Sequence, residues 1–212
     1  MPLQVKICGL NSREALAAAA EADYVGFVFY PPSPRSLSAA QAAPLAAAAP
    51  PRPRKVGLFV DASDEMIGEA IKAARLDLLQ LHGKESPARV RELRAKFRRN
   101  IVKAIPVAGT ADLGPASAYV GAADILLFDA KPPLRPGALP GGNAVSFDWR
   151  LLAGRSWPVP WWLSGGLTAA NVAEAAQISG ARTVDVSSGV EDRPGHKDPA
   201  LVRAFLAAAR RL

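Results

Sequence analysis

The sequence has few of the residues that build disulfides and transition-metal sites: one cysteine, Cys8, and two histidines, His82 and His196. A single thiol forms no internal disulfide, and by itself it cannot build a thiolate metal site. The sequence also lacks an apolar run long enough to cross a bilayer, and its first residues lack the basic start and apolar core of a signal peptide. We therefore expect a protein of the reducing cytoplasm that binds no membrane.

Acidic residues are outnumbered, with 19 Asp and Glu against 26 Lys and Arg, which gives a net charge of +7. Several arginines recur at helical spacing, as on a solvated helix face: Arg89, Arg91, Arg94, Arg98 and Arg99. No nucleic-acid-binding motif is present, and aromatic residues do not alternate with the basic ones. The charge favours a small anionic substrate and no nucleic-acid partner.

Short β-rich runs alternate with alanine-rich helical stretches along the whole chain. They predict eight strands: Gln4–Cys8, Tyr24–Phe29, Lys55–Val60, Leu78–Leu81, Ile101–Ile105, Ile125–Asp129, Trp161–Ser164 and Thr183–Val186. Eight βα units in one chain predict an α/β fold, a single-domain (β/α)8 TIM barrel over residues 1–212. The alternative is a doubly wound open sheet, but no strand is followed by G-x-G-x-x-G.

Start signals mark several of the helices between these strands. Ser38 with Gln41 predicts a capping box, and Ser86-Pro87 and Asp198-Pro199 each predict an N-cap followed by proline. Thr168 precedes a predicted helix over Ala169–Ala176, and Asp112–Tyr119 gives the weakest helical signal. The one long loop, Lys131–Asn143, is rich in proline and glycine, which is typical of a functional or mobile segment.

Polar residues occur where barrel strands are usually apolar. Side chains alternate along a strand, so Lys6 and Cys8 share one face, as do Gln80 and His82. Lys103 is the one charged residue of its strand, Asp129 ends an otherwise apolar run, and Asp185 shares a face of the last strand with Ser187. Each such residue by itself usually meets solvent or a loop. Cys8, His82, Asp129 and Asp185 together would converge on one mouth of the barrel and form an active site there.

Two glycine-bearing turns follow the last two strands, Ser164–Thr168 and Ser187–Val190. Gly165 and Gly166 in the first, with Ser187, Ser188 and Gly189 in the second, suit a phosphate, because glycine lets main-chain amides approach an anion closely. Ordinary tight turns are the alternative. Arg35 follows the second strand in a stiff, proline-rich segment and suits a carboxylate, although a lone arginine is more often a surface residue.

These segments together resemble the phosphoribosylanthranilate isomerase family. The matching motifs are VKICGL at 5–10, GFVFYPPSPRSLS at 26–38, VGLFVD at 56–61, LLQLHG at 78–83, LLFDA at 126–130, LSGGLTAANV at 163–172 and VDVSSGVEDRPGHKD at 184–198. The chain departs from the family pattern at Gly141-Gly142-Asn143-Ala144, where a further Gly and a Ser or Thr are usual. It also has Ser164 where the family often has alanine.

The resemblance implies an Amadori rearrangement in tryptophan biosynthesis. N-(5-phosphoribosyl)anthranilate would become 1-(2-carboxyphenylamino)-1-deoxyribulose 5-phosphate, with Cys8 as the general base and Asp129 as the general acid. It places the phosphate on Gly165, Gly166, Ser188 and Gly189 and the anthranilate carboxylate at Arg35, and gives His82 and Asp185 supporting roles. No cofactor or metal is expected, and the chain could be a monomer or a homodimer. Lys6 could either lower the pKa of the Cys8 thiol or pair with Asp185.

Other functions fit the residues less well. A pentulose-phosphate epimerase would need several histidine ligands, and an indole-glycerol-phosphate synthase would use a lysine and glutamates and leave Cys8 unexplained. A non-catalytic anion-binding barrel, or a basic RNA-binding protein, is the alternative outside enzymes. Intact Cys8 and Asp129 argue against a non-catalytic barrel, and RNA binding that disappears at modest salt would show the charge to be incidental.

Overall fold

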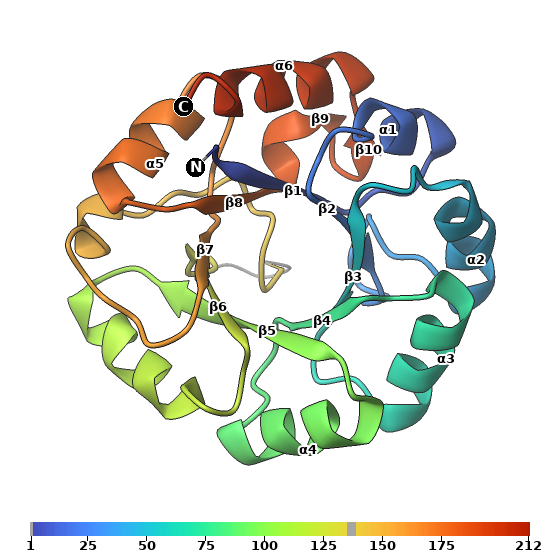
Figure 1. Ribbon diagram of the computed structural model, residues 1–212, viewed down its shortest axis with the longest axis horizontal. Coiled ribbons are helices and arrows are strands. Elements are labelled where there is room, and N and C mark those ends of the chain that lie inside the picture. Colours follow the sequence, from blue (N-terminus) through green and yellow to red (C-terminus); the bar gives the residue numbers. More distant parts are fainter. Residues whose placement is uncertain (1, 135–138) are drawn as a thin grey trace.

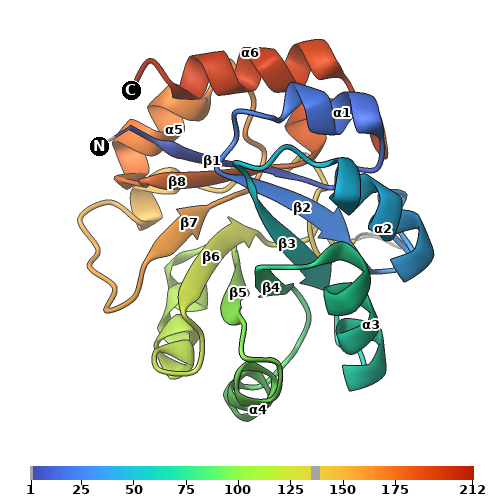
Figure 2. The ribbon, with the colours of Figure 1, turned by 45° about the vertical axis from the view of Figure 1, so that its right-hand side comes forward.

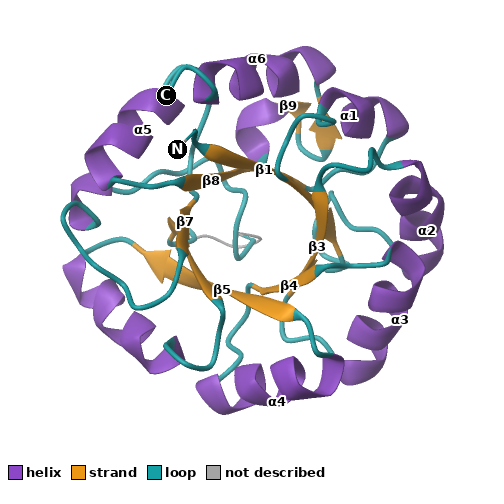
Figure 3. Ribbon diagram, in the orientation of Figure 1, coloured by secondary structure: helices purple, strands orange, loops and turns teal. Residues whose placement is uncertain are grey.

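A closed barrel of eight parallel strands forms the centre of the molecule, and helices surround it (Figures 1 and 3). In this computed structural model, which describes residues 2–134 and 139–212, the strands pair in chain order and β1 closes the ring against β8. The strands are β1 (Gln4–Cys8), β2 (Tyr24–Val28), β3 (Arg54–Phe59), β4 (Leu78–Leu81), β5 (Asn100–Val107), β6 (Ile125–Ala130), β7 (Trp161–Leu163) and β8 (Thr183–Val186). The predicted barrel is confirmed, and the open sheet is excluded.

The outer layer is made mainly of α-helices, which pack against the outer faces of the strands (Figure 2). They are α1 (Arg13–Ala18), α2 (Ala39–Ala48), α3 (Asp64–Ala74), α4 (Pro87–Phe97), α5 (Val172–Ser179) and α6 (Pro199–Ala209). Ser38 and Gln41 form the predicted capping box, and Ser86 and Asp198 cap α4 and α6 as predicted. None of the helices in the described residues is both long and apolar enough to cross a membrane.

The prediction of a helix after every strand is wrong at two places. β5 is followed by a 3-10 segment, η1 (Thr110–Tyr119), where Gly114-Pro115 interrupts regular α-helix. After β6 come the long loop, whose residues 135–138 lie outside the described part, and the short 3-10 turn η2 (Trp149–Leu151). The helix predicted over Ala169–Ala176 begins later, at Val172, because the Asn171 side chain bonds the amide of Thr168 and the carbonyl of Gly166 and so forms a turn instead.

Strand alternation divides the interior into two apolar regions. Side chains such as Val5, Ile7 and Phe128 point outward and pack under the helices, whereas a separate cluster fills the barrel itself: Tyr24, Val56, Leu78, Val102, Ala104, Ile125, Leu127 and Trp162. Lys6, Cys8, Gln80 and Asp185 share the inward faces of their strands with this cluster. The inner cluster fills the barrel as a packed core, and the polar residues Cys8 and Gln80 follow it toward the carboxyl ends of the strands.

Candidate active site

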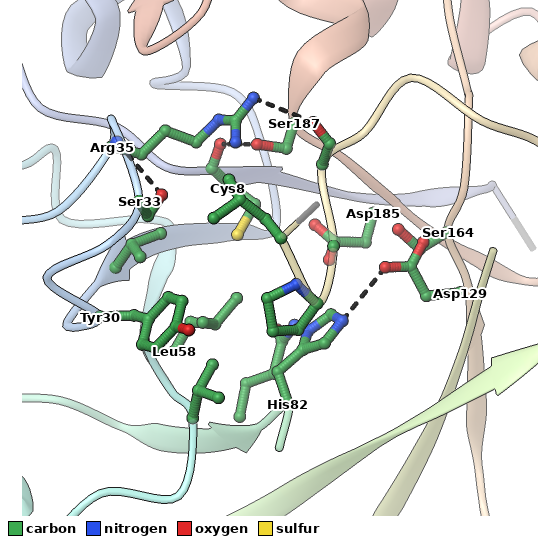
Figure 4. Close-up of a pocket in the computed structure, with 17 residues that line it drawn as sticks. Cys8, Tyr30, Ser33, Arg35, Leu58, His82, Asp129, Ser164, Asp185 and Ser187 are labelled. Carbon is green, nitrogen blue, oxygen red and sulfur yellow. Dashed lines mark hydrogen bonds and ion pairs between the residues drawn. The ribbon is translucent and has the colours of Figure 1, made fainter. Parts of the chain in front are cut away.

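The carboxyl ends of the strands surround a small hollow. Its wall includes most of the predicted site residues: Cys8, Arg35, His82, Asp129, Asp185 and Ser187. A second hollow adjoins it and shares Asp129, Asp185 and Ser187. The second one is lined by the other predicted residues, Gly165, Gly166, Ser188 and Gly189. The structure thus brings all ten predicted site residues to one mouth, and Figure 4 shows the six that line the first hollow.

Cys8 ends β1 with its side chain inside the barrel and only 4% of its surface exposed. Burial raises the pKa of the Cys8 thiol, and the nearby Lys6 ammonium offsets this only in part. The partner strand leaves room for the sulfur at Gly26, where an added Cβ would lie 3.0 Å from Sγ. Cys8 is therefore held in a narrow, dry position, mostly as the neutral thiol near pH 7.

Beneath Cys8, Lys6 pairs with Asp185 across the seam between β1 and β8. The Lys6 Nζ lies 2.9 Å and 3.0 Å from the two Asp185 carboxylate oxygens. Burial opposes the charge of Lys6, but Asp185 and Cys8 outweigh it and raise the pKa of Lys6. Burial raises the pKa of Asp185, with Lys6 acting against it. Both roles foreseen for Lys6 are present: it pairs with Asp185 through two hydrogen bonds, and it lowers the pKa of the Cys8 thiol.

Asp129 lies at the end of β6, inside a short chain of polar groups. Its Oδ1 accepts from the Ala130 amide at 2.9 Å, and its Oδ2 lies 3.1 Å from Nε2 of His82. On the far side of the ring, Nε2 of Gln80 lies 3.0 Å from Nδ1 of His82. With the Gln80 amide donating to Nδ1, the proton of neutral His82 sits on Nε2 and points at Asp129. An added Cβ on Gly141 would meet Asp129 Oδ2 and His82 Nε2 at 2.8 Å, so this contact lies directly under the loop that follows β6.

Arg35 is at the mouth as predicted, but it already has a protein partner. Its Nε and Nη2 each lie 2.7 Å from a different carboxylate oxygen of Glu191, a bidentate pair, and Nη2 also donates to the Gly142 carbonyl. Glu191 in turn pairs with Lys197. Burial opposes ionisation of Glu191, but Arg35 and Lys197 outweigh it and lower the pKa of Glu191. Glu191 fixes the plane of the Arg35 guanidinium.

Glu191 and Lys197 are site residues that the sequence reasoning missed. They lie on a small antiparallel hairpin, β9 (Glu191–Arg193) with β10 (His196–Lys197), which follows the 3-10 turn η3 (Ser188–Val190). Lys197 also donates to the carbonyl of Ser187, so the hairpin is tied to the end of β8. The sequence did offer a signal for them: both are charged and lie on either side of the turn Pro194-Gly195, within the family motif at 184–198.

Lys103 is not part of the mouth. It shares the outward face of β5 with Ile101 and Ile105, and its Nζ lies 2.8 Å from Oε2 of Glu85. The same nitrogen donates to the carbonyls of Leu81 and Gly83. Glu85 accepts the amides of Asp61 and Gly83. This buried pair fastens the loops after β3 and β4 from outside the barrel.

The two glycine turns form the floor of the second hollow. Gly165 and Gly166 have φ values of 95° and 64°, which glycine adopts without strain. An added Cβ on Gly189 would overlap the carbonyl oxygen of Leu167, so the two turns touch there. Within residues 2–134 and 139–212, the amides of Gly165, Gly166, Ser188 and Gly189 have no hydrogen-bond acceptor from the protein. Such amides are suited to an oxyanion.

The described residues hold no group of three or more His, Cys, Asp or Glu side chains arranged to bind a metal ion. What they do gather, at the carboxyl ends of a (β/α)8 barrel, is a buried thiol, a carboxylate held by a histidine, an oriented arginine and amides suited to an oxyanion. A barrel with this site belongs to the class of (β/α)8 enzymes that act on small anionic molecules.

Comparison with known proteins gives the family within that class. Residues 5–208 match the family of N-(5′-phosphoribosyl)anthranilate (PRA) isomerases. The chain is 58% identical over 214 residues to the N-(5′-phosphoribosyl)anthranilate isomerase of Rhodospirillum centenum, with 100% of both chains covered. It is similar to the solved phosphoribosyl anthranilate isomerase of Thermotoga maritima, with a TM-score of 0.88, 35% identity and coverage of 99% of this chain and 100% of that one.

A further solved structure is a phosphoribosyl anthranilate isomerase in complex with reduced 1-(o-carboxyphenylamino)-1-deoxyribulose 5-phosphate. Its TM-score is 0.83 at 33% identity, over 99% of this chain and 100% of that one. The chain therefore belongs to the PRA isomerase family and is an isomerase.

Proposed function

We propose that this enzyme converts N-(5′-phosphoribosyl)anthranilate to 1-(2-carboxyphenylamino)-1-deoxyribulose 5-phosphate, an Amadori rearrangement in tryptophan biosynthesis. One observation carries the proposal: Cys8 and Asp129 face the same hollow, between an arginine on one side and free turn amides on the other. That order of groups fits a substrate with a carboxylate at one end, a phosphate at the other and the reacting sugar carbons between them.

Asp129 is the proposed general acid for the first step. Opening of the ribose ring needs a proton on the ring oxygen while C1′ forms a Schiff base with the anthranilate nitrogen. The Asp129 carboxyl gives up that proton, and the resulting carboxylate accepts the hydrogen bond from His82 Nε2, 3.1 Å away. His82 and Gln80 are then positioning residues for the acid, which specifies the supporting role expected for His82.

Cys8 is the proposed general base for the second step. Its thiolate takes the proton from C2′ of the Schiff base, and the C2′–H electron pair forms the double bond of an enolamine. The enolamine becomes the ketone by losing its hydroxyl proton at C2′ and gaining one at C1′. The sequence moves protons only, so it needs no metal or organic cofactor. The buried position of Cys8 supports the role, because it keeps competing water from the reacting carbon.

The two anionic ends of the substrate give the remaining residues their proposed roles. The phosphate accepts hydrogen bonds from the amides of Gly165, Gly166, Ser188 and Gly189, where the hydroxyl of Ser187 fastens the turn by donating to the Cys8 carbonyl. The anthranilate carboxylate lies at Arg35, whose guanidinium Glu191 holds in place. We further propose that residues 1–212 are one catalytic domain, that it works in the cytoplasm as a monomer or homodimer, and that it uses no nucleic-acid partner.

Rescue of a tryptophan auxotroph that lacks this isomerase tests the proposal. We expect the wild-type gene to restore growth without tryptophan, and expect Cys8→Ala, expressed to the same level, to fail. Growth equal to wild type from Cys8→Ala would show that the rescue does not depend on the proposed base. Failure of the wild-type chain, with soluble protein present, would overturn the substrate assignment.

A further inference from the structure

The buried ion pair beneath Cys8 has no function in the reaction as proposed so far. Lys6 is fully buried and Asp185 nearly so, and the two residues are register partners on β1 and β8. Placing two charges in a barrel interior carries a large desolvation penalty for each, and a well-packed apolar pair often gives equal or greater stability. Stability alone therefore does not explain why charges occupy these positions in a lumen that is filled mainly by apolar side chains.

Geometry connects this pair to Cys8. Lys6 lies two residues before Cys8 on the same face of β1, and both side chains pass over Gly26 of β2. An added Cβ on Gly26 would lie 3.0 Å from Cys8 Sγ and 3.2 Å from Lys6 Cε, so the two side chains share the space that this glycine leaves. Asp185 lines the hollow beside Cys8 (Figure 4).

Charged and titratable groups face Cys8 from several elements. They are Lys6 on its own strand, Asp185 on β8, Asp129 on β6, Lys197 on β10, His82 after β4 and Arg35 after β2. After burial, Lys6 has the largest effect on the pKa of the Cys8 thiol, which it lowers, and Asp185 follows by raising it. The two members of one ion pair thus act on the thiol with opposite sign.

We propose that Lys6 and Asp185 are positioning residues that set the basicity of Cys8 from opposite directions. The Lys6 ammonium stabilises the thiolate, which makes proton release from the resting thiol possible inside an apolar barrel. Asp185 holds that ammonium and opposes the thiolate, which keeps Cys8 basic enough to take a proton from carbon. The proposal rests on the proposed role of Cys8 as the base.

Alkylation of the single cysteine tests the proposal without requiring activity. Iodoacetamide reacts with the thiolate, so its rate against pH reports the pKa of Cys8 alone. We expect Lys6→Met to move this profile to higher pH and Asp185→Asn to move it to lower pH. At a fixed pH below the thiol pKa, the fraction of Cys8 present as thiolate changes about tenfold for each unit of pKa. The rising limb of kcat/KM against pH moves in the same directions.

Two controls separate this effect from general loss of stability. Lys103→Met with Glu85→Gln removes the other buried lysine–carboxylate pair, on the outer side of the barrel, and leaves the alkylation profile where it is. A single variant leaves one charge buried without its partner, which can prevent folding. Lys6→Met with Asp185→Leu removes both charges together and so avoids that penalty. The midpoint pH of its alkylation profile lies between those of the two single variants and above that of wild type, because Lys6 has the larger effect on the Cys8 thiol.

Shifts in the same direction for both single variants, or an unchanged profile in the double variant, would overturn the proposal whatever the activity. A separate result would overturn the proposed function instead: opposite shifts in alkylation together with wild-type turnover by Cys8→Ala. In that case the pair tunes a thiol that is not the base.

Discussion

Cys8 is buried among charges of both signs, so its ionisation depends on burial as much as on any one neighbour. Burial is the largest effect and raises the pKa of the thiol above that of an exposed cysteine. A sequence shows that Lys6 shares a strand face with Cys8, but it does not show how dry that face is or that Asp185 takes the Lys6 ammonium. The reactivity of this residue therefore could not be predicted from its neighbours in the chain.

Native Cys8 is expected to bind its proton more tightly than the unfolded thiol. Its pKa, from the rate of iodoacetamide reaction, then exceeds the value measured in urea. The free energy of unfolding falls as pH rises from about 8.5, the unfolded pKa, until the native thiol ionises. In Cys8→Ala the decrease in the free energy of unfolding that is due to Cys8 disappears. Urea titrations of wild type and Cys8→Ala between pH 7 and 10 measure the difference. A native pKa equal to the unfolded one contradicts the prediction.

Glu191 is expected to act on substrate binding through Arg35. In Glu191→Gln the bidentate pair is lost and the guanidinium can turn away from the carboxylate site. We expect KM to rise about tenfold, with a smaller change in kcat, since charge-assisted hydrogen bonds contribute roughly 1.5–3 kcal/mol. Asp192→Asn, an exposed neighbour on the same hairpin, serves as the control and keeps wild-type KM. Equal losses in both variants would mean that the hairpin itself, not Arg35, was disturbed.

At the scale of elements, the strands were predictable and some of their connections were not. All eight predicted strands are present with ends within two residues of those observed, because buried parallel strands appear as apolar runs. The β9–β10 hairpin was missed because strands of two or three residues are too short to carry a pattern. The 3-10 segment η1 replaces a helix where Gly114 and Pro115 oppose one.

The candidate site followed from the strand ends. Cys8, His82, Asp129 and Asp185 were predicted to meet because the carboxyl ends of parallel barrel strands point to one mouth, and the structure brings them there. Ion pairs between side chains that are far apart in the sequence were not predictable in this way. Glu191 meets Arg35 across 156 positions of the chain, a contact that no local pattern encodes.

Among the described glycines, Gly189 leaves the least space for a side chain. In Gly189→Ala the new methyl group forces the turn after β8 away from Leu167 and separates the turn amides proposed to bind phosphate. We expect stability to fall by about 1–3 kcal/mol, and inorganic phosphate to protect the variant less against thermal unfolding than it protects wild type. Gly114→Ala, where an added Cβ meets nothing within 4 Å, is the matched control. Unchanged phosphate protection in Gly189→Ala would contradict the proposed phosphate site.

The whole molecule depends on closure of the ring between β1 and β8. Four register pairs join these strands, so the first and last segments of the chain stabilise each other. Both termini lie near the start of β1, on the side of the barrel opposite the mouth (Figures 1 and 2). This arrangement supports the proposal that residues 1–212 form one domain that cannot be cut into independent halves.

One cooperative unfolding transition is therefore expected. The four tryptophans all lie between Trp149 and Trp162, so their fluorescence reports on the region around β7, while far-UV circular dichroism reports on all helices and strands. If the barrel unfolds as a unit, the fluorescence and circular dichroism transitions have the same midpoint urea concentration. Separate midpoints would show that the region around β7 is an independent unit, against the single-domain proposal.

The central claim is that Cys8 takes a proton from the substrate carbon. Its most direct test is kcat/KM for the purified enzyme with N-(5′-phosphoribosyl)anthranilate, followed by the loss of substrate fluorescence, in wild type and in Cys8→Ala. Removal of a general base predicts a loss of about 10²–10⁴-fold or more, with the circular dichroism spectrum and the phosphate affinity unchanged. Turnover at the wild-type rate by Cys8→Ala would contradict the account.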